Sequence, residues 1–289
     1  MAGHVAYAVT RETPHRVSVH NGYPPLPGWV SAASPLVVAV SYSGNTEETL
    51  DCVSWAIHQE LEVVAVTSGG ELATVAGAES LPVVLVPSGY QPRAAIGWLS
   101  GVVLRIVSAA GIGDDPGPRL EAAAEVADAT MTGEPWDLAM GVAEALQGTV
   151  PMVRSGSPLT ATAAMRWRTQ LHENSKVPAF TSELPEADHN EIVGWTGAVC
   201  RFAVVDLIDH AEHDAISSRR RYTRELTEAH LGWAGEVVSR GDSALERLIS
   251  LTAVGDVVSW RLAELSGVDP VPVAVIEDLK ARLSQEQTT

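Results

Sequence analysis

The strongest constraint on the fold is an apolar run, Leu36–Val40, that passes directly into a hydroxyl-rich turn and then into a helix-like stretch. A strand, a polar turn and a helix start together form an anion site, because the first N–H groups of a helix lack intrahelical partners and the helix dipole is positive there. The turn contributes the hydroxyls of Ser41, Ser43 and Thr46, while Gly44 lets the backbone approach a ligand closely. An N-cap cluster is the alternative interpretation, but a single residue suffices for capping. Without the lysine of a P-loop or the glycine triplet of a dinucleotide fold, the turn is predicted to bind a small phosphate monoester.

The net charge of −17 argues against nucleic acid or an anionic membrane as a partner. It also repels a phosphate monoester at long range, so a site for such an anion must be locally positive. Arg93, Lys176 and Lys280 are the candidates for that local charge.

The 289 residues are enough for one large domain or two of ordinary size, and a hydrophobic content of 46% allows a substantial core. Cys52 and Cys200 lie in apolar settings far apart, and we expect reduced core thiols rather than a disulfide. No Cys/His spacing suggests a metal site. Neither a basic leader before an apolar stretch nor a run long enough to span a membrane is visible, so a cytoplasmic protein is predicted.

The first half of the chain alternates strand-like and helix-like segments, which predicts a parallel sheet with helices on both faces. The expected strands are Arg16–Val19, Leu36–Val40, Glu62–Thr67 and Leu81–Val86, and the expected helices are Ala2–Val9, Thr46–Glu60 and Ala94–Ala110. Proline and glycine then punctuate residues 111–118. A polar helix, Arg119–Ala129, follows this linker-like stretch.

The second half repeats the α/β pattern. The expected strands are Thr149–Arg154, Val177–Phe180 and Ala198–Leu207, and the expected helices are Leu159–Asn174, His213–Ala229, Leu245–Ser266 and Val271–Arg282. We therefore predict an α/β protein of two subdomains, 1–112 and 148–289, joined by a linker and connecting helix over 113–147. Ser68–Gly70 is expected to be a loop, Trp167 a core residue, and the cluster of Arg219, Arg220, Arg221 and Arg224 a solvated or dimer-facing helix side.

Three polar residues are candidates for chemistry. Glu173 ends a helix near a strand, and the helix dipole there disfavours a charged carboxylate, which suits a general base. A simple pairing with Lys176, three residues on, is the alternative, and the residues alone favour it. Arg93 opens a helix, where a cation is unfavourable, so something other than the helix dipole is expected to explain its position. A solvated surface arginine is the alternative interpretation. His189 can transfer protons near neutrality, but nothing local singles it out among nine histidines.

Four separated motifs resemble those of SIS-domain sugar isomerases, and more narrowly those of the bifunctional phosphoglucose/phosphomannose isomerases. In family order they are Ser-Tyr-Ser-Gly-Asn-Thr-Glu-Glu at 41–48, Pro-Arg-Ala-Ala at 92–95, Glu-Asn-Ser-Lys at 173–176 and His-Asn-Glu-Ile-Val-Gly at 189–194. The resemblance covers about residues 2–283. It implies two SIS-type, doubly wound subdomains with parallel sheets flanked by helices.

The resemblance also implies an aldose–ketose isomerase that acts on glucose 6-phosphate, and on mannose 6-phosphate as a second candidate, without metal or cofactor. The matched positions are Ser41, Ser43 and Thr46 for the phosphate, Glu173 for proton transfer through an enediolate, Arg93 for the enediolate charge, and His189 with Lys280 for opening the sugar ring. Lys280 matches an Ile-x-x-Leu-Lys setting. The family analogy places the histidine in the neighbouring subunit of a homodimer.

Two departures from the family pattern keep alternatives open. The strand and Gly-Gly-Ser loop that precede the first helix in the family are not seen before Ala2–Val9, which points either to a late gene start or to a lost part of the phosphate site. Residues 267–280 contain no threonine, whereas members that act on mannose 6-phosphate often carry one there. A non-catalytic SIS protein that binds or senses sugar phosphates is the main alternative. An amidotransferase-type module for amino sugars is another, although no N-terminal cysteine nucleophile is present.

Overall fold

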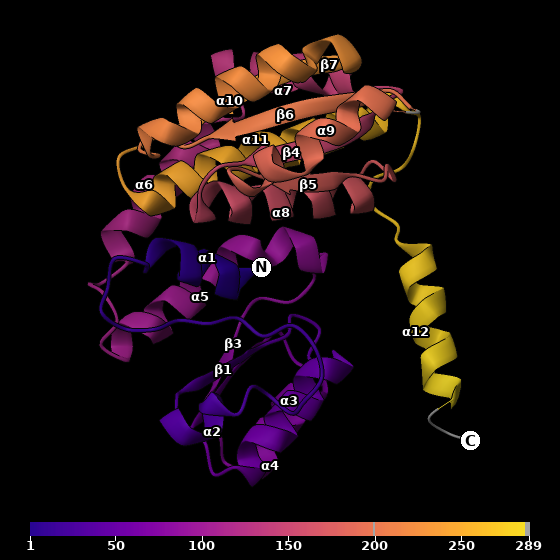
Figure 1. Ribbon diagram of the computed structural model, residues 1–289. Helices are drawn as coiled ribbons and strands as arrows, with labels where there is room; N and C mark the ends of the chain where they lie inside the picture. Colours follow the sequence, from indigo (N-terminus) through magenta and orange to yellow (C-terminus); the bar gives the residue numbers. More distant parts are fainter. Residues whose placement is uncertain (199, 287–289) are drawn as a thin grey trace. The chain divides into compact units, whose positions relative to one another are not determined.

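The computed structural model describes residues 1–198 and 200–286. These divide into two compact units, Met1–Glu121 and the residues from Ala122 onward. Each unit has its own sheet of parallel strands with flanking helices (Figure 1). The predicted α/β class is therefore confirmed. The division between the units falls inside the segment 113–147 that was expected to connect the two halves. No helix among the described residues is both long and apolar enough to cross a membrane.

The first unit contains a three-stranded sheet in the order β1-β2-β3. Its strands are β1 (Val37–Val40), β2 (Val63–Thr67) and β3 (Val83–Leu85), and its helices are α1 (Ala2–Val9), α2 (Trp29–Ala33), α3 (Glu47–His58), α4 (Gly70–Ala78), the 3-10 turn η1 (Pro92–Ala95) and α5 (Ile96–Ala109). The core forms where Val53 and Ala56 of α3 meet Ala65 of β2 and Leu72 of α4. These positions are apolar because α3 and α4 each turn one stripe toward the sheet.

The second unit contains a four-stranded sheet in the order β5-β4-β6-β7. Its strands are β4 (Val150–Ser155), β5 (Phe180–Glu183), β6 (Phe202–Ile208) and β7 (Trp233–Val238), and its larger helices are α7 (Gly133–Leu146), α8 (Pro158–Glu173), α10 (Asp214–Thr227), α11 (Ala244–Leu265) and α12 (Ala274–Glu286). α6 (Gly117–Ala129), α9 (Glu191–Gly194) and the 3-10 turns η2 (Glu186–His189), η3 (Trp195–Gly197) and η4 (Glu228–His230) complete the chain.

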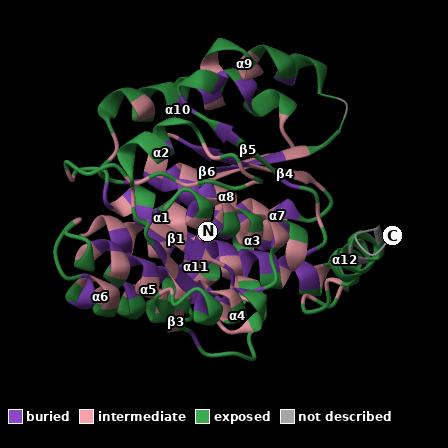
Figure 2. Cartoon of the chain, turned by 90° about the horizontal axis from the view of Figure 1, so that it is seen from below, coloured by how far each residue is buried: buried purple, intermediate pink, exposed green. Residues whose placement is uncertain are grey.

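The second sheet is covered on both faces. In Figure 2, α10 lies on one side of it, and α7, α8 and α11 lie on the other. The central strand β6 is buried along almost its whole length, as expected for a parallel strand between two helical layers. Trp167 is fully buried, which confirms its predicted core position, and its indole donates to the carbonyl of Leu251 at 2.7 Å. A Cβ at Gly255 would lie 2.4 Å from that ring, so α8 and α11 approach this closely only because residue 255 is glycine.

Several sequence expectations about secondary structure were wrong. Arg16–Val19 forms no strand; Val19 instead packs close to Gly3 of α1. The strand expected at Val177–Phe180 begins only at Phe180, because Lys176 adopts a left-handed conformation and the Val177 amide bonds back to α8. Ser68 and Gly69 form the expected loop, but Gly70 is already the first residue of α4, a helix that was not expected from the sequence.

Two expectations about individual side chains were also wrong. Cys200 is exposed, whereas Cys52 is half-buried and donates from Sγ to the carbonyl of Gly22. Arg220 is only 3% exposed instead of solvated, because it pairs with Glu212 and lies beside the buried Asp206. Arg224 also donates to Asp206, at 2.8 Å.

Candidate active site

The hydroxyl-rich turn sits at the carboxyl edge of the first sheet. Ser41 directly follows β1, and its amide extends the sheet by donating to the carbonyl of Val66 at 3.1 Å. The chain then closes on itself: the Gly44 amide donates to both the carbonyl and the hydroxyl of Ser41, each at 3.1 Å. The Ser43 hydroxyl accepts from the Asn45 amide at 3.3 Å. Local bonds therefore hold Ser41 and Ser43 in a compact turn before α3.

A second turn, which follows β2, locks the first one in place. Gly44 has φ +72°, and a Cβ there would lie 1.9 Å from the carbonyl oxygen of Gly69. Gly70 has φ +70°, and its Cβ would lie 2.2 Å from the carbonyl oxygen of Ser43. The Asn45 side chain accepts from the amide of Glu71 at 2.9 Å. The glycines thus permit a backbone-to-backbone contact that no other residue type would allow.

Thr46 is the N-cap residue of α3, but its side chain makes no capping hydrogen bond among the described residues. Its hydroxyl instead shares a hydrogen bond with the Ser41 hydroxyl at 2.8 Å. This bonding differs from the simple N-cap role that was the alternative interpretation of the turn.

Arg93 lies at the same edge of the first sheet as the turn after β1. It belongs to η1, which follows the carboxyl end of β3, and parallel strands bring their carboxyl ends to one edge. Tyr42 links the two regions, since its hydroxyl donates to the carbonyl of Pro87 at 3.0 Å and accepts from the Tyr90 amide at 2.9 Å. Sequence reasoning missed this link because the bonded residues are more than forty positions apart.

Glu173 is the last residue of α8, and the residues that follow it hold this helix end in place. Asn174 donates to the Ser259 hydroxyl at 2.9 Å, and the Ser175 hydroxyl donates to the Ser259 carbonyl at 2.6 Å. Lys176 donates from Nζ to the main-chain carbonyl of Glu173. The Glu-Asn-Ser-Lys motif therefore fixes the half-buried Glu173 against α11.

The other two predicted residues are both exposed, His189 at the end of η2 and Lys280 on α12. The residue before His189 anchors its turn to α10, because Asp188 accepts from the Thr223 hydroxyl at 2.6 Å and from Arg219 at 3.1 Å. The His189 ring therefore extends from a turn that Asp188 holds against α10.

Glu173 and His189 lie at opposite ends of the second sheet. α8 begins just after the carboxyl end of β4 and leads back to the amino end of the parallel strand β5, so Glu173 lies at the amino end. His189 follows the carboxyl end of β5. A 16-residue helix is about 24 Å long, which separates the two side chains within one copy of this unit.

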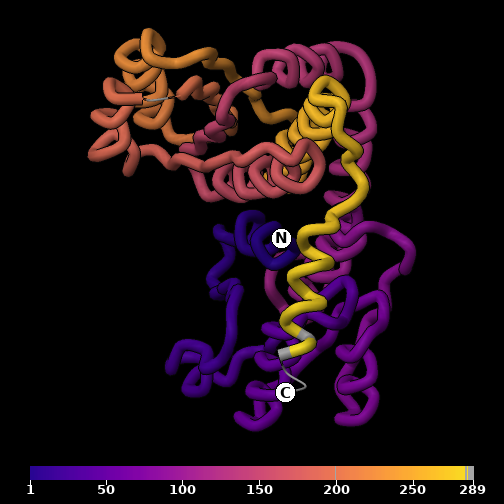
Figure 3. The backbone as a smooth tube through the Cα atoms, turned by 90° about the vertical axis from the view of Figure 1, so that its right-hand side faces the viewer, coloured from indigo at the N-terminus to yellow at the C-terminus, as the bar shows by residue number. Residues whose placement is uncertain are grey.

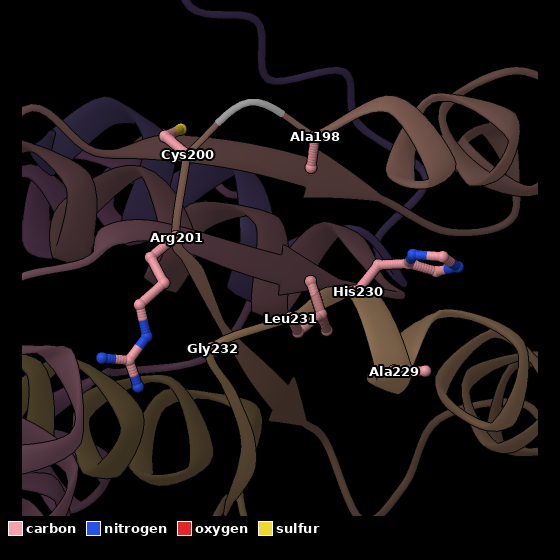
Figure 4. A pocket seen from close by; sticks show the side chains of 7 residues that line it. All are labelled: Ala198, Cys200, Arg201, Ala229, His230, Leu231 and Gly232. Atoms are coloured by element: carbon pink, nitrogen blue, oxygen red, sulfur yellow. The ribbon is translucent and has the colours of Figure 1, made fainter.

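A concave region of about 500 Å³ lies at the amino ends of β6 and β7 (Figure 4). It is lined by Ala198, Cys200, Arg201 and the segment 229–232, and by none of the seven predicted site residues. In the described part of the chain, no three His, Cys, Asp or Glu side chains are grouped so that they could hold a metal ion.

Comparison with known proteins identifies similar sequences and folds. Residues 137–283 match the family model described as "Bacterial phospho-glucose isomerase C-terminal SIS domain". The bifunctional phosphoglucose/phosphomannose isomerase of Aquifex aeolicus is 36% identical over 86% of this chain and 76% of its own length. The enzyme of the same name from Caldicellulosiruptor bescii is 34% identical over 90% of this chain and 79% of its own. The crystal structure of a hypothetical protein from Thermus thermophilus shares the fold, with a TM-score of 0.78 over all of this chain and 81% of that one, at 18% identity.

Proposed function

Because the chain belongs to the bifunctional phosphoglucose/phosphomannose isomerase family, we propose that it interconverts glucose 6-phosphate and fructose 6-phosphate. Mannose 6-phosphate is a second candidate substrate. The absence of a threonine from residues 267–280 argues against it, because the members that act on mannose 6-phosphate often carry one there. The observation that carries the proposal is the anchoring of Glu173. The next three residues all hold the end of α8, as is required of a base that must reach two neighbouring carbon atoms.

The proposed reaction is a proton transfer between neighbouring carbons of the open-chain sugar. Glu173 takes the proton from C2 of the aldose, which places negative charge on O1 of an enediolate. The proton of the O2 hydroxyl passes to O1, and Glu173 returns its own proton to C1. C2 and O2 are then left as the carbonyl of the ketose. Arg93 stabilises the enediolate oxygen as a fixed cation. Ser41, Ser43 and Thr46 hold the phosphate, since charged acceptors form the stronger hydrogen bonds.

Ring opening precedes that transfer, because the substrate is mostly a closed hemiacetal. One proton must leave the anomeric hydroxyl and one must reach the ring oxygen. His189 and Lys280 serve these roles in the proposal, since imidazole accepts and donates protons near neutral pH and an ammonium donates hydrogen bonds. No metal or cofactor takes part in this scheme.

An assay of the purified chain with glucose, mannose, fructose and glucosamine 6-phosphates tests the proposal. We expect turnover between the glucose and fructose esters, and equal rates with and without a chelator. Binding of these esters in calorimetry without any turnover would instead support the non-catalytic sugar-phosphate-binding protein. Turnover of the amino sugar alone would support the amidotransferase-type module.

The separation of Glu173 and His189 supports a further part of the proposal, a homodimer whose active site takes its histidine from the neighbouring subunit. Glu173→Gln and His189→Asn should each be nearly inactive alone. When the two variants are mixed and allowed to exchange subunits, we expect about a quarter of wild-type activity, because half of the dimers are hybrids with one intact site each. A mixture as inactive as its components would contradict the shared site.

A further inference from the structure

Lys176 occupies an unusual position between α8 and β5. It is one of only two lysines among the 19 lysine and arginine residues of the chain, and the other is Lys280. Its backbone has φ +58°, a left-handed conformation that is unfavourable for a residue with a Cβ. This backbone geometry accompanies a side chain that reaches back over the end of α8. The position therefore has a use that offsets the conformational cost.

The Lys176 ammonium group joins two segments of the second unit that are far apart in sequence. Nζ donates to the carbonyl of Glu173, to that of Pro272 at 2.8 Å and to that of Pro270 at 3.3 Å. An ammonium has three donors, and these three carbonyls converge on it. A cation is also favourable at a helix C-terminus, where the last carbonyls lack intrahelical partners.

The segment that Lys176 binds is the base of α12. The Asp269 carboxylate accepts from the Val271 amide at 2.9 Å, which stiffens a stretch that two prolines already restrict. Beyond this base, α12 extends as a separate helix after the end of α11 (Figure 3). Val275 and Leu279 on it are 84% and 55% exposed, so these apolar side chains do not fix the helix by packing.

Lys280 lies about 10 Å along the helix axis from Val273, at 1.5 Å per residue. The direction in which α12 leaves its base therefore decides where Lys280 is presented. A small rotation at residues 270–272 would move the ammonium of Lys280 by several ångströms.

We propose that Lys176 is a positioning residue that ties the base of α12 to the end of α8, and thereby sets where Lys280 lies relative to Glu173. This inference rests on the proposed function for its catalytic consequence. Its structural part, the tether between α8 and α12, stands without that function. A compact ammonium suits three convergent carbonyls better than the planar guanidinium of arginine does.

The structural part is tested by hydrogen exchange on Lys176→Met, which keeps the length of the side chain and removes its donors. We expect faster exchange of the amides in 273–283, with the rest of the second unit unchanged. Gln147→Met is the matched control, because Gln147 also donates to a carbonyl at a helix end, that of Leu265, at 2.9 Å. It should leave the exchange of 273–283 as in the wild type. Unchanged exchange in Lys176→Met would overturn the tether.

The catalytic part is tested by a double-mutant cycle on isomerisation. A misplaced catalytic group costs about 10- to 100-fold in rate, so Lys176→Met should lower kcat by this factor with little change in KM. In a Lys280→Met background the same substitution should cost almost nothing, because the group that it positions is already gone. If the fold-losses in kcat of Lys176→Met and Lys280→Met multiplied fully in the double variant, the positioning role would be overturned. If the wild-type chain turns over no sugar phosphate, the proposed function fails, and hydrogen exchange alone decides the tether.

Discussion

The two units contain the same local architecture, a strand followed by a short hydroxyl-rich turn and a helix, but they use the hydroxyls differently. In the second unit, the turn between β4 and α8 is closed by a capping box. The Ser157 hydroxyl accepts from the Thr160 amide at 3.2 Å, while the Thr160 hydroxyl accepts from the amides of Gly156 and Ser157 at 3.0 and 2.9 Å. The donors that an anion would need are consumed within the turn.

The space beside that turn is also filled by the protein itself. A Cβ at Gly156 would lie 2.3 Å from Ile216 and 3.0 Å from a guanidinium nitrogen of Arg220. In the first unit, by contrast, the Thr46 side chain caps no amide of the described residues, and its hydroxyl pairs with that of Ser41. The same topology thus closes the turn with a capping box in the second unit, whereas in the first unit the hydroxyls of the turn are the groups proposed to bind phosphate. The two turns therefore differ in which groups their hydroxyls bond, not in how many hydroxyls they contain.

The largest effect on activity is expected at Glu173, which lies at the end of α8 away from the β4–α8 turn. In the proposal, the second unit provides the general base at the end of α8, whereas its β4–α8 turn has a structural role alone. Glu173→Gln should then lower kcat by about 10²- to 10⁴-fold, the usual contribution of a general base. Binding of fructose 6-phosphate should persist in calorimetry, and the thermal midpoint should hold. Glu144→Gln on the exposed side of α7 is the control and should match the wild type. Retained turnover in Glu173→Gln would remove the proposed base.

Next in size is the effect of the first turn on binding. Thr46→Val removes one hydroxyl from the proposed phosphate site at nearly constant volume. Hydrogen bonds to charged groups contribute about 1.5–3 kcal/mol, so KM should rise by about 10- to 100-fold. The free energy of unfolding should fall by no more than about 1 kcal/mol, because the Thr46 side chain loses its bond to the Ser41 hydroxyl but caps no amide among the described residues. A loss of stability with an unchanged KM would show that the first turn is structural, like the second.

The second turn should give the reverse pattern. Ser157→Ala removes the hydroxyl that accepts from the Thr160 amide, and the loss of such a cap costs about 1 kcal/mol of stability. KM should remain as in the wild type. Urea denaturation measured beside steady-state kinetics separates the two quantities. If Ser157→Ala raised KM as strongly as Thr46→Val, the two turns would share one role and the comparison would fail.

The sequence predicted the fold best where local periodicity carries the information. β1, β2 and β4 are apolar runs that end in polar turns, and α8 and α11 were expected within one residue of their observed limits. β7 was missed because Trp233–Val238 is a half-exposed outer strand with a glycine and a glutamate inside it. Such a strand lacks the continuous apolar run of a central one.

Long-range pairing explains most of what sequence reasoning missed. Arg220 belongs to a charged helical stretch, and its burial is made favourable by Asp206 and Glu212, which lie on other segments. The links from Tyr42 to residues 87–90 and from Lys176 to residues 270–272 likewise join distant parts of the chain. The seven site residues came from motifs, and their roles stay predictions until the variants above are measured.

The smallest expected effect concerns a second capping box of the second unit, at the start of α11. The Ser243 hydroxyl donates to Glu246 at 2.6 Å, and this bond, followed by one from the Asp242 amide, lowers the pKa of the Glu246 carboxyl below its ordinary 4.5. A lowered native pKa means that the carboxylate stabilises the fold above pH 4.5, and that this stabilisation is lost as the pH falls through the native value.

Glu246→Gln keeps a hydrogen-bonding side chain at the third position of α11 but removes the charge. We therefore expect slightly lower stability than the wild type at neutral pH, by less than Ser157→Ala loses, and equal stability in acid. Urea titrations at several pH values would measure the difference, with Glu125→Gln on the exposed side of α6 as the control. No counterpart is expected at the start of α3 in the first unit, because its N-cap residue, Thr46, pairs there with the Ser41 hydroxyl, which does not titrate as a carboxylate does. A difference between Glu246→Gln and the wild type that persisted at low pH would show that the α11 cap acts through packing rather than through charge.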